Sequence, residues 1–369
     1  MQLVQATRDA LLKPLSTVVG IVERRNTLPI LANILLRKEG NNVAFVASDI
    51  EVQITSHAEI GVDDSTQSTT VAARKLLDIL RALPETGDIK LGLDSAKLSI
   101  QSGKSRFALQ TLDAADFPAV DLPAQWDVSF TMTQKSLKHL FNMVHFAMAQ
   151  QDIRYYLNGL LFVFEPGFAR AVATDGHRLA HSGAAVEGIA SRHDVIVPRK
   201  TVLEVQRLLN ETDTPVNIDV AAGQIRFRFD NVELISKLVE GKFPDFTRVI
   251  PSNYTRHFSV NRELLLGCLQ RAAILTTDKL KGVRIQLGDH LMKISSTNAE
   301  QEEAREEIDI DYSHEALDVG FNVGYLLDVL GNLKTETVQW SVQPDVNASA
   351  LITSPDDDQF KYVVMPMRI

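Results

Sequence analysis

The 369-residue sequence contains a single cysteine, Cys268, which excludes a scaffold held together by internal disulfides. We interpret Cys268, within the apolar segment 264–269 (LLLGCL), as a small buried side chain rather than a nucleophile. No apolar run approaches the roughly 20 residues of a membrane span, and the first residues (MQLVQ) lack the basic and apolar regions of a secretion signal. Together these absences predict a cytoplasmic protein with no membrane partner.

Excess positive charge is also missing, since the formal net charge is −9. An acidic chain of this kind does not simply coat nucleic acid. Hydrophobic residues make up 45% of the sequence and charged residues 23%, which is enough apolar material for two or three cores and excludes disordered and fibrous classes.

Motifs for catalysis and cofactor binding are absent as well. Residues 103–105 (GKS) look like the end of a phosphate-binding loop, but the glycine required five residues earlier is Leu98. The sequence has no nucleophile elbow, zinc-protease motif, dinucleotide fingerprint or calcium-loop pattern. His177 and His181 are four residues apart on strand-like sequence, where we expect no metal site. We therefore expect a non-enzymatic protein without cofactors.

The most informative feature present is an internal repeat. The helix-like segments 77–80 (LDIL), 203–206 (LEVQ) and 327–330 (LDVL) recur at a spacing of about a third of the chain. The triplets 47–49 (ASD), 173–175 (ATD) and 296–298 (STN) keep the same step, and so do Phe117-Pro118, Phe243-Pro244 and Met365-Pro366. A period this long matches a domain, so we predict three homologous domains at 1–127, 128–255 and 256–369.

Each third also repeats one pattern of secondary structure. A strand leads into a helix (8–20, 134–149 and 261–273), several strands follow, and a second helix (73–83, 198–209 and 324–334) precedes further strands. Segments 225–229 (IRFRF) and 98–101 (LSIQ) alternate apolar and polar residues, as one-sided antiparallel strands do. The sequence therefore predicts an α+β protein whose domains each contain two β-α-β-β-β halves, with helices on one face of each sheet.

Charge divides unevenly between these elements. The six predicted helices carry thirteen basic and five acidic side chains, although the whole chain is acidic. One interpretation is the ordinary enrichment of Lys and Arg on helix surfaces. The other is a shared basic face that holds phosphates without regard to sequence. A tandem-domain scaffold that never meets DNA, the third class considered, predicts no such segregation.

Several segments resemble one known family in order along the whole chain. They are 154–159 (RYYLNG), 173–180 (ATDGHRLA), 241–246 (GKFPDF) and 362–369 (YVVMPMRI), and they are similar to the bacterial DNA polymerase III β subunit, the β sliding clamp. The resemblance implies a head-to-tail homodimeric ring with helices inside and sheets outside, which encircles duplex DNA and tethers polymerases without chemistry of its own. Its expected partners are the DNA polymerase III α subunit and other polymerases, the clamp loader, and mismatch-repair and other proteins that carry a clamp-binding motif.

The same resemblance implies a pocket for partner peptides, built from the second and third domains. Aliphatic and methionine side chains dominate it, and unbranched Met can repack around different peptides. The implied pocket residues are Leu157, Thr174, Gly176, His177, Arg178, Leu179, Pro244, Arg248, Val249, Val363, Met365, Pro366, Met367 and Arg368.

The resemblance also implies DNA contacts and a dimer interface. The DNA-contacting positions would be Arg25 and Gln151, with Arg74, Lys75, Arg81, Arg199 and Lys200 as phosphate neighbours. The interface would pair Phe107 and Leu109 of one subunit with Ile274 and Leu275 of the other, and Lys104 and Arg106 would face Glu300, Glu302 and Glu303. Such complementary charge would fix the head-to-tail orientation, whereas the alternative for the acidic run is a solvated loop.

Overall fold

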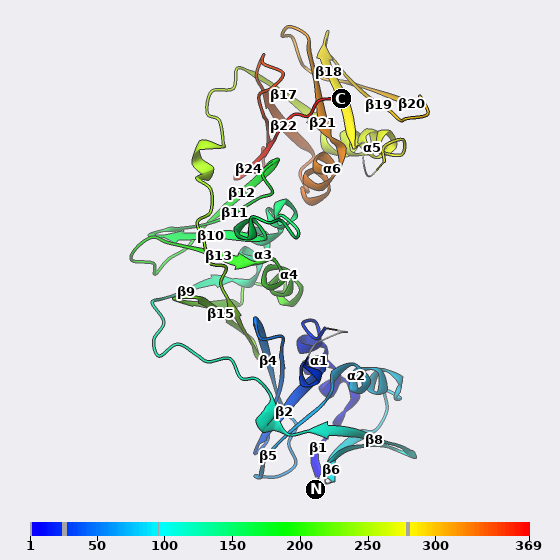
Figure 1. Cartoon of the computed structure of the whole chain (residues 1–369), viewed down its shortest axis with the longest axis vertical. Coiled ribbons are helices and arrows are strands. Elements are labelled where there is room, and N and C mark those ends of the chain that lie inside the picture. The colour runs from blue at the N-terminus through cyan, green and yellow to red at the C-terminus, as the bar shows by residue number, and fades with distance from the viewer. Residues whose placement is uncertain (1, 24–27, 95, 278–280) are drawn as a thin grey trace. The chain divides into compact units, whose positions relative to one another are not determined.

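A computed structural model describes residues 2–23, 28–94, 96–277 and 281–369 of the chain (Figure 1). The chain divides into two compact units. Unit 1 comprises Met1–Lys135 and Leu203–Leu238, and unit 2 comprises Ser136–Val202 and Val239–Ile369.

The first third of the chain contains two successive β-α-β-β-β segments. The first consists of β1 (Gln2–Thr7), α1 (Arg8–Val19), β2 (Asn33–Glu39), β3 (Asn42–Ser48) and β4 (Val52–Glu59), with a short 3-10 turn at Pro29–Ala32. The second consists of β5 (Thr66–Ala72), α2 (Ala73–Ala82), β6 (Asp88–Asp94), β7 (Lys97–Ser102) and β8 (Ser105–Leu112), and another 3-10 turn follows at Ala114–Asp116.

The middle third repeats this order. Its first half is β9 (Val128–Thr133), α3 (Gln134–Asn142), β10 (Gly159–Glu165), β11 (Phe168–Thr174) and β12 (Arg178–Ala185), with short helical turns η3 (His145–Ala147) and η4 (Tyr155–Leu157) after α3. Its second half is β13 (His193–Pro198), α4 (Arg199–Leu208), β14 (Pro215–Ala221), β15 (Gln224–Phe229) and β16 (Val232–Lys237), and η5 (Phe246–Arg248) follows.

The last third repeats the order once more. Its halves are β17 (Arg256–Asn261), α5 (Arg262–Ala273), β18 (Gly282–Gly288), β19 (Leu291–Thr297) and β20 (Glu303–Asp309), then β21 (Leu317–Asn322), α6 (Val323–Asn332), β22 (Thr337–Val342), β23 (Ala350–Ser354) and β24 (Asp357–Val364). The predicted α+β fold of three tandem domains, each with two β-α-β-β-β halves, is confirmed.

Five of the six predicted helices agree with the structure to within two residues at each end, but the prediction of a helix over 134–149 is wrong. Helix α3 ends at Asn142, and the chain then turns tightly, with the Val144 amide donating to the Phe141 carbonyl at 3.2 Å. Met143, Val144 and residues 147–149 are nevertheless buried. The apolar pattern therefore continues past the helix end, because these residues enter the core from a turn.

Side-chain caps explain why helices begin directly after strands. The Thr7 hydroxyl accepts a hydrogen bond from the Ala10 amide, and the Asn261 side chain accepts one from the Leu264 amide at 2.9 Å. Asn322 caps α6 in the same way through the Gly324 amide. Each cap satisfies an amide that the first helical turn leaves without a partner.

The sheets run across the predicted domain boundaries within each unit. In unit 1 the strand order is β1-β6-β7-β8-β5-β2-β3-β4-β16-β15-β14-β9, and β4 pairs with β16 through Ile54 opposite Leu234. In unit 2 the order is β13-β10-β11-β12-β24-β23-β22-β17, and a separate sheet has the order β20-β19-β18-β21. Every strand pairing in the described part of the chain is antiparallel, and the predicted alternation is present in β7 and β15.

One buried charge in unit 1 has a structural explanation. The Lys38 side chain is almost fully buried, and its ammonium donates to the carboxylate and carbonyl of Asp63 and to the carbonyl of Ser65. Hydrogen bonds from Lys38 hold the pKa of Asp63 far below its usual range. The polar loop before β5 is thus anchored to the sheet rather than only solvated.

Among the described residues, no helix is both long and apolar enough to span a membrane.

Candidate functional site

An apolar cluster in unit 2 joins several of the predicted peptide-pocket residues. It occupies one face of the sheet formed by β13, β10, β11, β12 and β24, where Leu179 lies directly opposite Val363. Segment 239–250 crosses this face and contributes Phe243 and Phe246 to the cluster. The buried members are Ala149, Leu157, Leu161, Val163, Val172, Leu179, Ile196, Phe243, Phe246 and Val363. Three predicted residues, Leu157, Leu179 and Val363, are therefore brought together.

The turn between β11 and β12 borders this cluster and is held by its own side chains. The Asp175 carboxylate accepts hydrogen bonds from the amides of His177 and Arg178 at 2.9 and 3.1 Å. The Thr174 hydroxyl donates to the Arg178 carbonyl at 2.6 Å and accepts from the Gly176 amide at 3.1 Å. Gly176 has a φ of 91°, a conformation that favours glycine. The turn places the exposed His177 in a fixed position.

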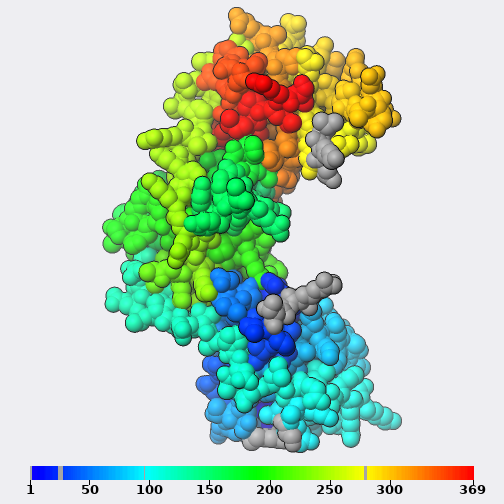
Figure 2. Space-filling view, viewed as in Figure 1, coloured from blue at the N-terminus to red at the C-terminus, as the bar shows by residue number. Residues whose placement is uncertain are grey.

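Exposed apolar side chains follow the segments that carry this buried cluster. Val249 follows η5, and Met365 and Met367 follow β24, and each exposes between 37% and 43% of its surface. The Met365 amide donates to the His177 carbonyl at 2.9 Å, which fixes the C-terminal residues beside the turn. We name the apolar patch by its buried floor, Leu157, Leu179 and Val363, and its exposed rim, Val249, Met365 and Met367. The C-terminal residues are visible in red on the surface in Figure 2.

The remaining predicted pocket residues lie next to the patch. Pro244 is exposed between the two buried phenylalanines of segment 239–250. Arg248 is exposed and pairs with Asp245 at 3.1 Å. Pro366 is half-buried, whereas Arg368 is exposed.

Arg178 differs from the expectation. Successive strand residues point to opposite faces of a sheet, so Leu179 faces the patch and the Arg178 side chain points away from it. The Arg178 guanidinium donates to Asp328 at 2.5 Å and to the Phe146 carbonyl at 2.7 Å, and it lies 4.3 Å from the centre of the Tyr325 ring. This side chain joins β12 to α6 and also pairs with Asp175 at 3.1 Å in the turn beside the patch, so its part in peptide binding stays a prediction.

Burial and charge act in opposite directions on this arginine. Desolvation lowers the pKa of Arg178, but Tyr362, Asp328 and Asp175 outweigh it and hold the pKa above its ordinary value. Arg178 is therefore a permanent, paired cation inside unit 2, and its removal would leave Asp328 without this partner.

The loop before η4 carries Gln151, a predicted DNA contact. Gln151 is exposed with a φ of 54°. The Asp152 carboxylate accepts from the Arg154 guanidinium at 2.8 and 3.0 Å, and the same guanidinium donates to the Asp175 carbonyl at 3.0 Å. Arg154, which the sequence did not single out as a site residue, therefore braces the turn that carries His177 against this loop.

The predicted phosphate neighbours fall into two groups. Arg74, Lys75 and Arg81 are exposed on α2 in unit 1, although the Arg74 guanidinium also donates to the Val22 carbonyl at 2.7 Å. Arg199 is half-buried on α4, where its guanidinium lies 3.4 Å from the Met148 carbonyl, and its neighbour Lys200 is also half-buried. Desolvation, followed by the charge of Arg178, lowers the pKa of Arg199. Arg25 lies outside the described residues.

Other basic helix residues are already paired within the chain. Arg207 donates to Glu204 and to the carbonyl of Thr17, and Arg271 forms a bidentate pair with Glu306. The charge excess of the helices therefore overstates the positive charge available to a partner.

The predicted interface residues lie on two open strand edges. Strand β8 pairs with β7 over residues 105–110, and its described pairing with β5 involves only Thr111 and Leu112. Phe107 on the open part of β8 is 39% exposed, Leu109 is half-buried, and Lys104 and Arg106 are exposed beside them. Strand β20 is the last strand of its sheet, so its second edge is open among the described residues.

The residues around β20 complete the second predicted surface. Ile274, at the end of α5, is 77% exposed, and Leu275 is half-buried. Glu300, Glu302 and Glu303 are all exposed. Two of these carboxylates have partners in the chain, since Glu302 accepts from Asn298 and Glu303 pairs with Arg305.

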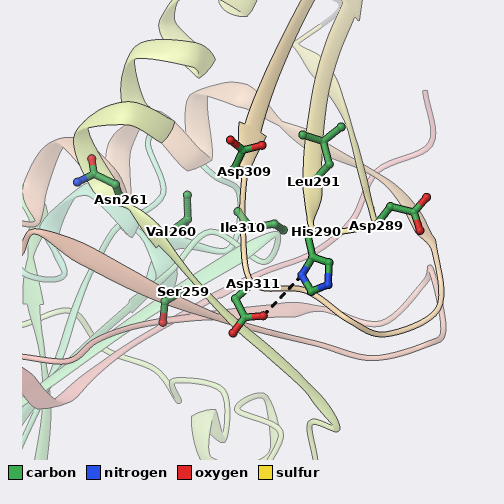
Figure 3. A pocket seen from close by; sticks show the side chains of 9 residues that line it. All are labelled: Ser259, Val260, Asn261, Asp289, His290, Leu291, Asp309, Ile310 and Asp311. Atoms are coloured by element: carbon green, nitrogen blue, oxygen red, sulfur yellow. Dashed lines mark ion pairs between the residues drawn. The ribbon is translucent and has the colours of Figure 1, made fainter.

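A separate hollow of about 630 Å³ lies in the last third of the chain, away from the residues predicted from sequence (Figure 3). It is lined by Ser259, Val260, Asn261, Asp289, His290, Leu291, Asp309, Ile310 and Asp311. His290 and Asp311 approach to 3.6 Å, and both are exposed. In the described part of the chain, no group of His, Cys, Asp and Glu side chains has a metal-binding arrangement.

Sequence reasoning missed two groups of residues at the patch. Phe243 and Phe246 supply its covering aromatic rings, and Arg154 supplies the brace. The phenylalanines flank Pro244 in segment 241–246, so the sequence shows the motif but does not show that their side chains pack in the cluster. Tyr155 is exposed, whereas Tyr156 packs against the cluster.

Three repeated domains, an apolar patch and the open edges of β8 and β20 are features of a multidomain binding protein. Comparison with known proteins identifies its family. Residues 1–121, 131–245 and 247–368 match the N-terminal, central and C-terminal domains of the DNA polymerase III beta subunit. The beta sliding clamp of Pseudomonas aeruginosa is 45% identical over 363 residues, which cover 98% of each chain.

Solved structures agree with this assignment. The DNA polymerase III subunit beta from Pseudomonas aeruginosa superposes with a TM-score of 0.95 at 44% identity and full coverage of both chains. A sliding clamp of the same organism bound to griselimycin gives the same TM-score, identity and coverage. The chain belongs to the DNA polymerase III β subunit family, the β sliding clamps, whose members are non-catalytic processivity factors of DNA replication.

Proposed function

We propose that two copies of this chain close head to tail into a ring around duplex DNA, and that the apolar patch tethers replication proteins to that ring. The open edges of β8 and β20 are the single observation that carries the ring. They differ from one another and lie far apart in sequence, so one edge of each copy can be completed by the other edge of a second copy. Two such contacts close a dimer.

Side chains at the two edges support this pairing. Phe107 and Ile274 are exposed apolar residues that a strand-to-strand contact would bury. Lys104 and Arg106 at one edge have the charge opposite to Glu300 and Glu303 at the other. Complementary charge disfavours pairing of like edges and so fixes the orientation. Leu109, Leu275 and Glu302 complete the proposed interface.

The DNA side of the proposal is sequence-independent attraction. Lys75 and Arg81 are exposed cations on α2, and Gln151 is an exposed polar residue on its loop. Arg25, Arg74, Arg199 and Lys200 complete the proposed set, in which Arg199 contributes less freely because carbonyl oxygens already surround it. A ring that holds phosphates loosely can slide, whereas base recognition would stop it.

The patch is proposed to bind a short peptide segment of each partner. A buried apolar floor next to exposed methionines suits one or two apolar anchor residues, and flexible Met side chains can adapt to different sequences. The proposed partners are the DNA polymerase III α subunit, other polymerases, the clamp loader and mismatch-repair proteins, all in the cytoplasm. The griselimycin-bound relative supports a ligand site on this fold.

The proposal is tested by retention on DNA. After loading by a clamp loader, the protein should remain on a closed circular duplex through a wash at raised salt and should leave when the circle is cut. A protein that binds by surface charge alone would leave both forms equally as salt rises. Equal retention on circular and linear duplex would refute the ring.

A further inference from the structure

We propose that Gly282 and Gly320 form a seat for the C-terminal residues and thereby position the rim of the apolar patch. This inference rests on the proposed peptide-binding function and adds two positioning residues to it. The glycines lie on the same face of neighbouring strands, because Gly282 pairs with Asn322 and Gly320 pairs with Arg284. The C-terminus lies beside β18 and β21 in Figure 1.

The C-terminal residues fill the space that these glycines leave. A Cβ atom added at Gly282 would lie 2.3 Å from Cγ2 of Ile369. A Cβ atom added at Gly320 would lie 2.5 Å from Cγ1 of Ile369 and 2.5 Å from the Met367 carbonyl oxygen. Atoms cannot approach this closely, so a larger residue at Gly320 must displace the main chain at Met367, and one at Gly282 must displace the Ile369 side chain from its place.

Backbone conformation does not account for these two glycines. Neither has the positive φ that makes glycine necessary in turns such as that of Gly176. Glycine inside a strand costs stability and commonly marks a place where another part of the backbone approaches closely. At Gly320 the approaching backbone is that of Met367, whose amide donates to the Gly320 carbonyl at 2.8 Å, whereas at Gly282 the approaching atoms belong to the side chains of Ile369 and Met367.

The seat connects directly to the patch. The C-terminal segment is held at two points, by the Met365 amide on the His177 carbonyl and by the Met367 amide on the Gly320 carbonyl. Pro366 between them has no amide hydrogen to satisfy. The seat therefore determines where the exposed side chains of Met365 and Met367 stand, which preorganises the rim for a peptide.

The two glycines should respond differently to substitution. In Gly282→Ala the new methyl group meets only side-chain atoms of the C-terminal residues, chiefly Ile369. In Gly320→Ala it also meets the Met367 main-chain oxygen. Removing the Ile369 side chain should therefore cancel the effect of Gly282→Ala and leave most of the effect of Gly320→Ala.

Protection of the C-terminus tests the seat without reference to any partner. We expect carboxypeptidase to release Ile369 from Gly282→Ala at least about fivefold faster than from the unmodified protein, since overpacking of this size disfavours the seated state. Gly288→Ala is the matched control on the same strand, because its Cβ would meet Ala316 at an ordinary 3.6 Å. Equal release rates from Gly282→Ala and Gly288→Ala would overturn the seat.

Peptide affinity tests whether the seat affects the patch, and the probe is a fluorescent peptide rich in Gln and Leu. Gly282→Ala should bind at least about fivefold more weakly, while Gly282→Ala with Ile369→Ala should bind no more weakly than Ile369→Ala alone. Additive losses in the double variant would overturn the proposal. Met365→Ala separates the two ideas: if it leaves peptide affinity unchanged, the patch assignment is wrong, and the seat is then judged by the release rates alone.

Discussion

A single chain forms the apolar patch almost completely, whereas it leaves the open strand edges without a partner. The patch has a buried floor, a turn whose amides are satisfied by Asp175, and a C-terminal segment fixed by two main-chain hydrogen bonds. Among the described residues, β8 and β20 each have an edge without a strand partner, and exposed side chains lie on β8 (Phe107) and at the end of α5 (Ile274). A preorganised site loses little entropy when it binds a short peptide, whereas an open edge is completed only by another strand. The two surfaces should therefore fail independently.

The largest expected effect comes from the edge near α5. Ile274→Ala with Leu275→Ala removes apolar area that the proposed dimer buries at both of its contacts, at about 1.5–3 kcal/mol for each large side chain. We expect monomers in sedimentation velocity at low micromolar concentration, with peptide affinity unchanged. Because Leu275 is half-buried in the single chain, Ile274→Ala alone serves as the control for folding. A variant that sediments as a dimer would place the interface elsewhere.

Deletion of residues 365–369 makes the converse test. It removes Met365 and Met367 from the rim and leaves the floor of Leu157, Leu179 and Val363. Loss of a hot-spot wall typically costs about 2 kcal/mol or more, roughly thirtyfold in affinity. Peptide affinity is measured by fluorescence anisotropy, and the oligomeric state of the same sample is measured by sedimentation velocity. Unchanged peptide affinity would show that the patch assignment is wrong. Loss of the dimer would show that the patch and the dimer interface depend on each other.

The repeat explains why so much of the fold was predictable from sequence. The triplets that end at Asp49 and Asp175 both lead into a turn. Each aspartate carboxylate accepts hydrogen bonds from the backbone amides two and three residues later. The residue that follows each aspartate, Ile50 or Gly176, has a positive φ. A marker that recurs because the backbone requires it is visible without a structure.

Side-chain direction was harder to predict. Arg178 and Leu179 are neighbours in one motif, yet only Leu179 faces the patch, because the strand register fixes which alternate residues face which side. The glycine seat was likewise invisible, since Gly282, Gly320 and Ile369 meet only after the sheet has formed. The early end of α3 belongs to the same class, because burial and not helical periodicity produced its apolar pattern.

A smaller effect is expected from exposed charge. Lys75→Ala removes one exposed cation, which should reduce the salt dependence of DNA binding by nearly one unit of log-log slope if Lys75 contacts a phosphate. The control is Arg207→Ala, whose guanidinium is already bonded to Glu204 and the Thr17 carbonyl. Peptide affinity and sedimentation should stay unchanged in both variants. Equal slopes for Lys75→Ala and the unmodified protein would show that Lys75 is only solvated surface.

The smallest effect concerns the brace between Asp152, Arg154 and the turn at Asp175. Hydrogen bonds from Arg154 lower the pKa of Asp152 to about 2, compared with about 3.9 for an unfolded chain. A depressed carboxyl pKa stabilises the fold above the unfolded value, and this contribution is lost as pH falls from about 4 to about 2. The brace should therefore be intact at pH 5, where Asp152→Asn weakens the peptide complex slightly, and this difference between variant and unmodified protein should persist at pH 3 and shrink only as the pH approaches 2. Carbon NMR of the carboxyl group gives the direct measurement, with Asp152→Asn identifying the resonance. A midpoint near pH 4 would show that Arg154 does not hold Asp152 in solution, and the turn would then depend on Asp175 and Thr174 alone.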